Sequence, residues 1–114
     1  MDITNQGQGA SSIYENNVVI KANISLIGAL RAAQQLVLDG MITVTDRIWC
    51  GGNMTVDGII TCGNQMKTNN LMVKGHTIIE GEVVVTNNMV VNTEFCLIDG
   101  SLYVTGNLKI DGIL

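Results

Sequence analysis

Residues 101–112 read Ser-Leu-Tyr-Val-Thr-Gly-Asn-Leu-Lys-Ile-Asp-Gly, which is one six-residue unit written twice. Each unit runs polar, apolar, any residue, apolar, polar and glycine, so its first part alternates with period two, as a β-strand does. The glycine that follows can adopt a positive φ and turn the chain. Each unit therefore predicts one short strand followed by one corner.

The same repeat extends back to residue 17, and the units at 53–58 and 70–75 match it most closely. A fixed repeat reports architecture directly, because each unit buries its apolar side only against its neighbours. The second position of the unit is apolar sixteen times in succession: Val18, Ile24, Leu30, Leu36, Ile42, Ile48, Met54, Ile60, Met66, Met72, Ile78, Val84, Val90, Cys96, Leu102 and Leu108.

Strands this short are not stable alone, but coiling lets each one pair in parallel with its counterpart one turn later. Units begin at Asn53, Asn70, Asn88 and Asn107, and these starts are separated by seventeen, eighteen and nineteen positions, close to three units per turn. We therefore predict an all-β fold, a single-stranded parallel β-solenoid of about five triangular turns, each of roughly 17–19 residues. One wall should carry the inward pairs Leu36/Leu38, Met54/Val56, Leu71/Val73, Met89/Val91 and Leu108/Ile110.

The repeat slips by one residue twice, with a five-residue step from Met66 to Leu71 and a seven-residue step from Phe95 to Leu102. Between the slips, the expected inward set is Leu71, Val73, Ile79, Val83, Val85, Met89, Val91, Phe95 and Leu97. The residues that then point outward are Met72, Ile78, Val84, Val90 and Cys96.

A solenoid wall is normally polar outside, so an outward apolar band indicates a contact surface. We predict an oligomer interface at Met72, Ile78, Val84 and Val90, together with the apolar terminal residue Leu114. The alternative is that the register differs and the band is core.

Residues 1–16 are rich in Gly, Ser, Gln and Asn and lack the repeat. This composition predicts a flexible or partner-bound N-terminal arm ahead of a solenoid domain at 17–114. Residues 25–38 also place apolar side chains at helical spacing, so a capping helix is an open alternative there. The six-residue repeat runs through the segment and favours strand.

The 114-residue chain has a net charge of −4 and scattered basic residues, which gives no electrostatic footprint for nucleic acid or an anionic membrane surface. No apolar run reaches the length of a membrane span, and residues 1–12 lack the apolar core of a signal peptide. Cys50, Cys62 and Cys96 fall on apolar positions of the repeat, which predicts free, buried thiols. Free thiols imply that the protein folds in a reducing compartment.

Catalytic chemistry is not indicated. The one histidine, His76, falls at a corner, where a solvated side chain is expected. A zinc site of Cys50, Cys62 and His76 would lack the usual ligand spacing, and Glu80 and Glu82 are better explained as a solvated edge than as an acid pair. We therefore predict no catalytic, cofactor-binding or metal-binding residues, no cofactor and no enzymatic activity.

The units at 53–58, 101–106 and 107–112 resemble the "NLTVNG"-type repeats of viral and phage fibre, spike and other virion structural proteins, which are commonly β-helical and often trimeric. The resemblance covers residues 35–112 and implies a non-catalytic structural protein of a virion: a minor capsid, cement, fibre or spike component. The implied partners are the chain itself, as a homotrimer or higher assembly, and other structural proteins, with no nucleic acid, membrane or small-molecule substrate. The implied location is the virion, after synthesis in a reducing cytoplasm.

A polar arm ahead of a short β-helix also resembles bactofilins, bacterial cytoskeletal proteins whose β-helical core polymerises end to end. This second resemblance implies a scaffold in the bacterial cytoplasm.

Overall fold

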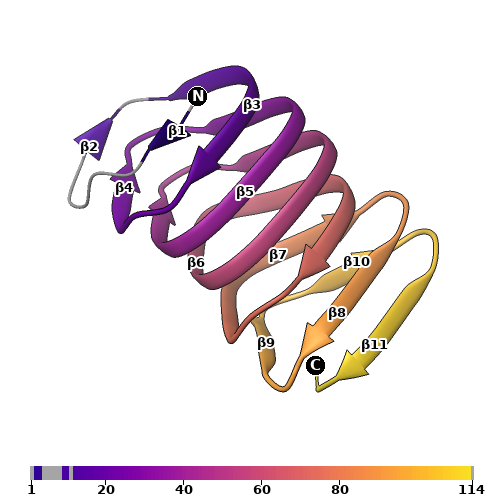
Figure 1. Cartoon of the computed structure of the whole chain (residues 1–114). Coiled ribbons are helices and arrows are strands. Elements are labelled where there is room, and N and C mark those ends of the chain that lie inside the picture. The colour runs from indigo at the N-terminus through magenta and orange to yellow at the C-terminus, as the bar shows by residue number, and fades with distance from the viewer. Residues whose placement is uncertain (1, 4–8, 11, 114) are drawn as a thin grey trace.

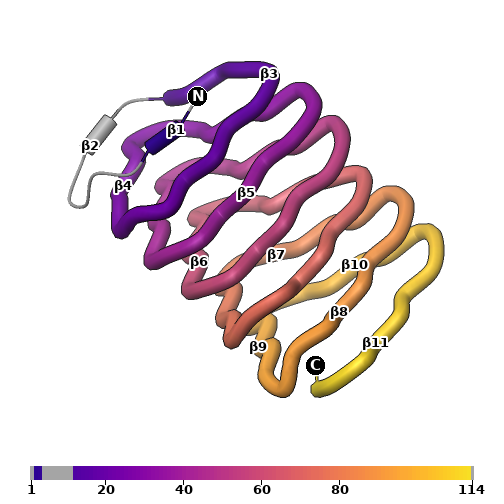
Figure 2. Tube along the Cα trace, viewed as in Figure 1, coloured from indigo at the N-terminus to yellow at the C-terminus, as the bar shows by residue number. Residues whose placement is uncertain are grey.

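The computed structural model describes residues 2–3, 9–10 and 12–113. Within those residues every element is a β-strand, and all strand pairs are parallel in one coiled sheet. Figure 1 shows the coil progressing along one axis from the N-terminal end to the C-terminal end, and the tube in Figure 2 shows its turns stacked one on the next. The predicted parallel β-solenoid is therefore confirmed.

Strands and corners run into one another along the coil, so some elements are long. The 26 residues of β6 span more than a full turn as one strand, and its pairing with β7 shifts register between Thr61 and Gln65. In chain order the strands are β1 (Asp2–Ile3), β2 (Gly9–Ala10), β3 (Ile13–Ile20), β4 (Ile24–Leu26), β5 (Leu30–Val44), β6 (Ile48–Val73), β7 (Thr77–Val85), β8 (Met89–Thr93), β9 (Cys96–Asp99), β10 (Leu102–Val104) and β11 (Leu108–Gly112).

The pairing register gives the length of each turn. Leu36 of β5 pairs with Met54 of β6, which lies eighteen positions further along the chain. The offset is seventeen positions from Met66 to Val83 and nineteen from Met89 to Leu108. These offsets agree with the turn length predicted from the spacing of the repeated units.

The coil begins earlier than predicted. β1 pairs with β3, β2 pairs with β4, and Ile13 of β3 pairs with Leu30 of β5. β1, β2 and residues 13–16 of β3 lie inside the segment 1–16 that was predicted as an arm, so the boundary expected at residue 17 falls within β3. The added pairing brings the coil to about six turns, compared with the five predicted.

Each turn has three walls, and we name each wall after characteristic side chains on its outer surface or leading corner. The asparagine wall, named for the asparagines along its leading corner, comprises 2–3, 18–20, 36–38, 54–56, 71–73, 89–91 and 108–110. The aromatic wall comprises 13–15, 30–32, 48–50, 66–68, 83–85 and 102–104. The aliphatic wall comprises 9–10, 24–26, 41–44, 59–62, 77–80 and 96–99.

The core is a set of internal ladders in which like residues stack from turn to turn. On the asparagine wall, Leu36, Met54, Leu71 and Met89 are each no more than 1% exposed, as the inward pairs predict. Burying a side chain of this size contributes about 1.5–3 kcal/mol. In the last described turn Leu108 is 44% exposed, because it has a covering ladder on one side only.

The first slip of the repeat is confirmed, because Met66 and Leu71 are both buried. The second slip was misplaced. Phe95 and Leu97, predicted inward, are 38% and 48% exposed, whereas Cys96, predicted outward, is 3% exposed. The extra residue lies in the corner at 92–95, where the Phe95 N–H donates to the Thr93 hydroxyl, and this shift turns the following strand over by one position.

The segment 25–38 is strand and not helix. It contains the end of β4 and the first part of β5, whose Leu30, Ala32, Leu36 and Leu38 are buried in the core. A helix over residues 25–38 would not place these four side chains in the stacked core. The strand interpretation of the six-residue repeat is therefore confirmed.

The inward register predicts opposite effects for adjacent residues of the asparagine wall. Val56 is fully buried and Thr55 points outward. Val56→Asp should unfold the chain, because it places an unpaired carboxylate in an apolar core at a cost above about 4 kcal/mol. Urea denaturation followed by circular dichroism measures this, with Thr55→Asp as the matched control. Equal losses of stability in the two variants would contradict the register.

Candidate functional site

The predicted interface residues that the structure describes all point outward, but they lie on three different walls. Met72 and Val90 pair side by side on the asparagine wall, Val84 is on the aromatic wall, and Ile78 is on the aliphatic wall. Met72 is 40% exposed and the other three are half-buried. Leu114 lies outside the described residues. The outward direction of the four is confirmed, and their part in an interface remains a prediction.

Ile78 belongs to a continuous outward row that we call the apolar stripe. Strand pairing aligns Met41 with Ile59, Ile59 with Ile78, and Ile78 with Leu97. Met41, Ile59 and Leu97 are 56%, 37% and 48% exposed. The stripe therefore places four apolar side chains over four successive turns at a spacing of about 4.8 Å.

The six-residue repeat predicts only Ile78 of these four residues as outward and apolar. Met41 and Ile59 occupy the first position of the six-residue unit, which is usually polar, and this departure was the available signal. Leu97 was assigned to the core.

An aromatic pair extends the apolar stripe at its C-terminal end. The rings of His76 and Phe95 stack with 4.3 Å between their centres and 24° between their planes. These residues precede Ile78 and Leu97 by two positions, so they lie next to the stripe. His76 is exposed, as its corner position predicts, and one face of its ring lies against Phe95.

Hydrogen-bonded amides follow the leading corner of the asparagine wall. The Asn70 side chain donates to Asn53 (2.9 Å), Asn87 donates to Asn70 (2.9 Å), and the Asn107 N–H donates to the Asn88 side chain (3.1 Å). Each bond joins one turn to the next. The repeated asparagines thus clamp the corners of successive turns, and this explains their position at the start of the unit.

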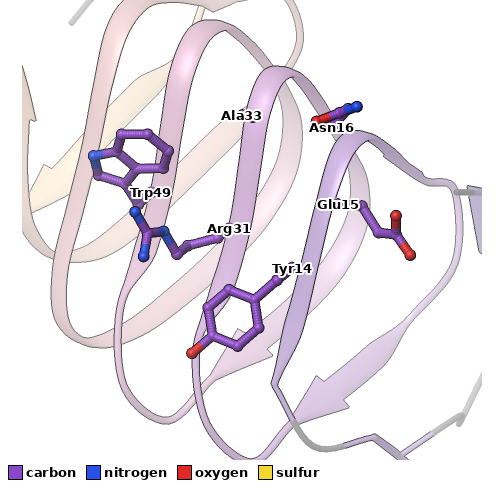
Figure 3. Close-up of a pocket in the computed structure, with 6 residues that line it drawn as sticks. All are labelled: Tyr14, Glu15, Asn16, Arg31, Ala33 and Trp49. Atoms are coloured by element: carbon purple, nitrogen blue, oxygen red, sulfur yellow. The ribbon is translucent and has the colours of Figure 1, made fainter.

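The aromatic wall carries an alternating row of rings and cations. Figure 3 shows the Arg31 guanidinium between the Tyr14 and Trp49 side chains. Tyr14 projects from the turn before that of Arg31, and Trp49 projects from the turn after it. The guanidinium carbon lies 5.9 Å from the Tyr14 ring centre and 4.6 Å from that of Trp49. Arg31 makes no ion pair within the described residues, and its guanidinium lies over these two rings. Contacts of this kind stabilise by about 0.5–1 kcal/mol at exposed sites.

A shallow hollow of about 470 Å³ lies beside this stack, lined by Tyr14, Arg31 and Trp49 among others. The Glu15 carboxylate points away from the stack in Figure 3. The Trp49 ring extends towards Gly51, whose missing side chain leaves room for it. Arg31 therefore occupies the space between the two rings, 4.6 Å from the Trp49 ring centre.

The side chains that most often hold metal ions are dispersed over the described part of the chain. No three His, Cys, Asp or Glu side chains there come close enough to hold a metal ion. Cys50, Cys62 and Cys96 are free and buried. The six-residue repeat predicts this for Cys50 and Cys62, and the corrected position of the second slip explains it for Cys96. Burial raises the pKa of the Cys62 and Cys96 thiols above the ordinary value of 9.0, which keeps them protonated and unreactive near neutral pH.

Over residues 2–3, 9–10 and 12–113, no helix has the length and apolar character needed to cross a membrane. Comparisons of the chain with protein-family models, with curated proteins and with solved structures find no match.

The two raised thiol pKa values predict a loss of stability in alkaline solution. Above pH 9 the unfolded chain releases the protons of Cys62 and Cys96, whereas the folded chain retains them, so the free energy of unfolding should fall as pH rises. Urea titrations between pH 7 and pH 10 measure the slope. The variant with Cys62→Ala and Cys96→Ala should show a shallower slope, and an unchanged slope would contradict the assignment.

The Arg31 stack predicts a spectroscopic change, because Trp49 is the only tryptophan. Arg31→Ala should expose one face of the indole, shift its emission to longer wavelength and lower the free energy of unfolding by about 0.5–1 kcal/mol. Lys109→Ala, which removes an exposed cation from the asparagine wall, is the control and should leave the emission unchanged. Identical spectra for the two variants would show that Arg31 does not cover the ring.

Proposed function

We propose that this protein is a non-catalytic structural component of a larger protein assembly, with a virion as the favoured setting: a minor capsid, cement, fibre or spike protein. The observation that carries the proposal is the apolar stripe. Met41, Ile59, Ile78 and Leu97 form a contiguous apolar row on the outside of the coil. Rows of this kind on a protein surface mark sites of protein association.

The fold supports a mechanical role. Every turn is joined to the next by parallel strand pairing and by stacked core residues, and asparagine hydrogen bonds reinforce the corners. These contacts make the coil a stiff rod that presents its walls in fixed relative positions. A stiff coil with an apolar stripe on its outer surface suits lateral packing in a shell or fibre, and the virion setting rests on the repeat resemblance.

End-to-end polymerisation, as in a bactofilin-like scaffold, is a second candidate. It is favoured by the last described turn, where the inward residues Leu108 and Ile110 are 44% and 46% exposed. Further strands added at this edge would bury both side chains and pair the free backbone groups of β11. This contact would extend the rod along its axis and would not use the apolar stripe.

The solution mass of the purified chain distinguishes the two candidates. Light scattering over a hundredfold range of concentration, with negative-stain images of the same samples, should give a discrete small oligomer if the chain packs laterally. Filaments that lengthen with concentration would favour the end-to-end scaffold instead. A monomer at every concentration would contradict both forms of self-assembly.

A further inference from the structure

The aliphatic wall has the size and pattern of a self-complementary interface. Resting on the proposed structural function, we infer that two copies of this chain pack aliphatic wall against aliphatic wall, antiparallel, about a two-fold axis. The axis lies in the interface at right angles to the coil axis, midway between Ile59 and Ile78. In this packing Met41 faces Leu97 of the second copy, and Ile59 faces its Ile78.

The flat side of the molecule that carries the aliphatic wall suits a second copy as the occupant. The molecule measures 33 × 24 × 22 Å, so this whole side, wall and corners together, presents at most roughly 700 Å². A stable interface buries about 800 Å² on each partner. Two flat sheets of this kind pack face to face at an intersheet distance of about 10 Å, which interdigitating apolar side chains fill.

The second outward row of the wall determines the orientation. Strand pairing aligns Thr43 with Thr61, Thr61 with Glu80, and Glu80 with Asp99, so hydroxyls occupy one end of the row and carboxylates the other. Antiparallel packing reverses this row on the partner. Glu80 then meets Thr61 and Asp99 meets Thr43, where hydroxyl groups can donate hydrogen bonds to both carboxylates.

Parallel packing gives a worse match. In parallel packing the two-fold axis runs along the coil through the middle of the wall. The apolar stripe of one copy would then face the threonine and carboxylate row of the other. Ile78 would then face Glu80, and Leu97 would face Asp99, so two carboxylates would be buried against apolar side chains. That desolvation is unfavourable without compensating donors.

Site-specific cross-linking tests the orientation. Met41→Cys and Leu97→Cys variants are prepared separately, and each is treated with a bis-maleimide reagent that spans about 10 Å, alone and as a mixture. The antiparallel dimer predicts cross-linked product in the mixture only, because the two copies of either single position lie about three strand spacings apart along the axis. The wild-type chain, treated with the same reagent, is the control for reaction at the native Cys50, Cys62 and Cys96, which are 4% exposed or less. Cross-linking of either single variant with itself would overturn the antiparallel arrangement.

A matched pair of lysine variants tests the wall. Ile78 and Val84 are both half-buried outward residues of β7, on the aliphatic and aromatic walls respectively. Ile78→Lys should weaken dimerisation about tenfold or more in sedimentation velocity, while Val84→Lys should leave it unchanged. Circular dichroism confirms that both variants are folded.

The outcomes separate this inference from the proposed function. An oligomer that survives Ile78→Lys but dissociates with another outward variant would overturn the aliphatic interface and leave the structural role in place. A wild-type chain that remains monomeric would overturn the dimer together with lateral self-assembly.

Discussion

The in-register stacking of like side chains from turn to turn is the constraint on which the rest of this structure depends. Each wall of the coil is a single layer of strands around a narrow core. Each inward side chain is therefore covered by the equivalent side chains one turn before and one turn after. Leu36, Met54, Leu71 and Met89 are buried to within 1% in this way, whereas Leu108, with a neighbour on one side only, is nearly half exposed. Any change in the number of residues per turn must therefore be absorbed outside the walls.

The corners absorb these changes, and they do so with particular residues. Gly40 and Gly58 stack with φ values of +147° and +143°, and a side chain on Gly58 would collide with the Gly40 backbone. Where a corner lacks that geometry, a buried threonine satisfies the backbone instead. The Thr77 hydroxyl donates to the Gly75 carbonyl (3.0 Å), and that of Thr68 donates to the Asn70 carbonyl (3.0 Å). Both threonines are buried, although threonine is more often a surface residue.

Sequence periodicity was sufficient for the fold because alternation with period two and a nearly constant turn length follow from geometry that every turn shares. It was insufficient at residues 95–98, where Phe, Cys, Leu and Ile are all apolar and alternation cannot distinguish inside from outside. There the hydrogen bonding of the corner at 92–95 and the pairing of β9 with β7 decide the register. The six-residue repeat does not predict the apolar stripe for a related reason. Met41 and Leu97 occupy different positions of the unit, and only strand pairing across four turns aligns them.

Stacking also explains why an apolar residue on the outside of a solenoid has larger consequences than on an ordinary protein surface. Repetition converts one exposed position into a continuous row, since the same position returns about 4.8 Å away on the next turn. On the aromatic wall the exposed rings are covered by a side chain of the same wall. The Arg31 guanidinium lies over the faces of Tyr14 and Trp49 and keeps its own charge in solvent. The apolar stripe has no such interleaved cation among Met41, Ile59, Ile78 and Leu97. Because the coil is too stiff to fold these side chains inward, they are removed from water only when a second surface covers them.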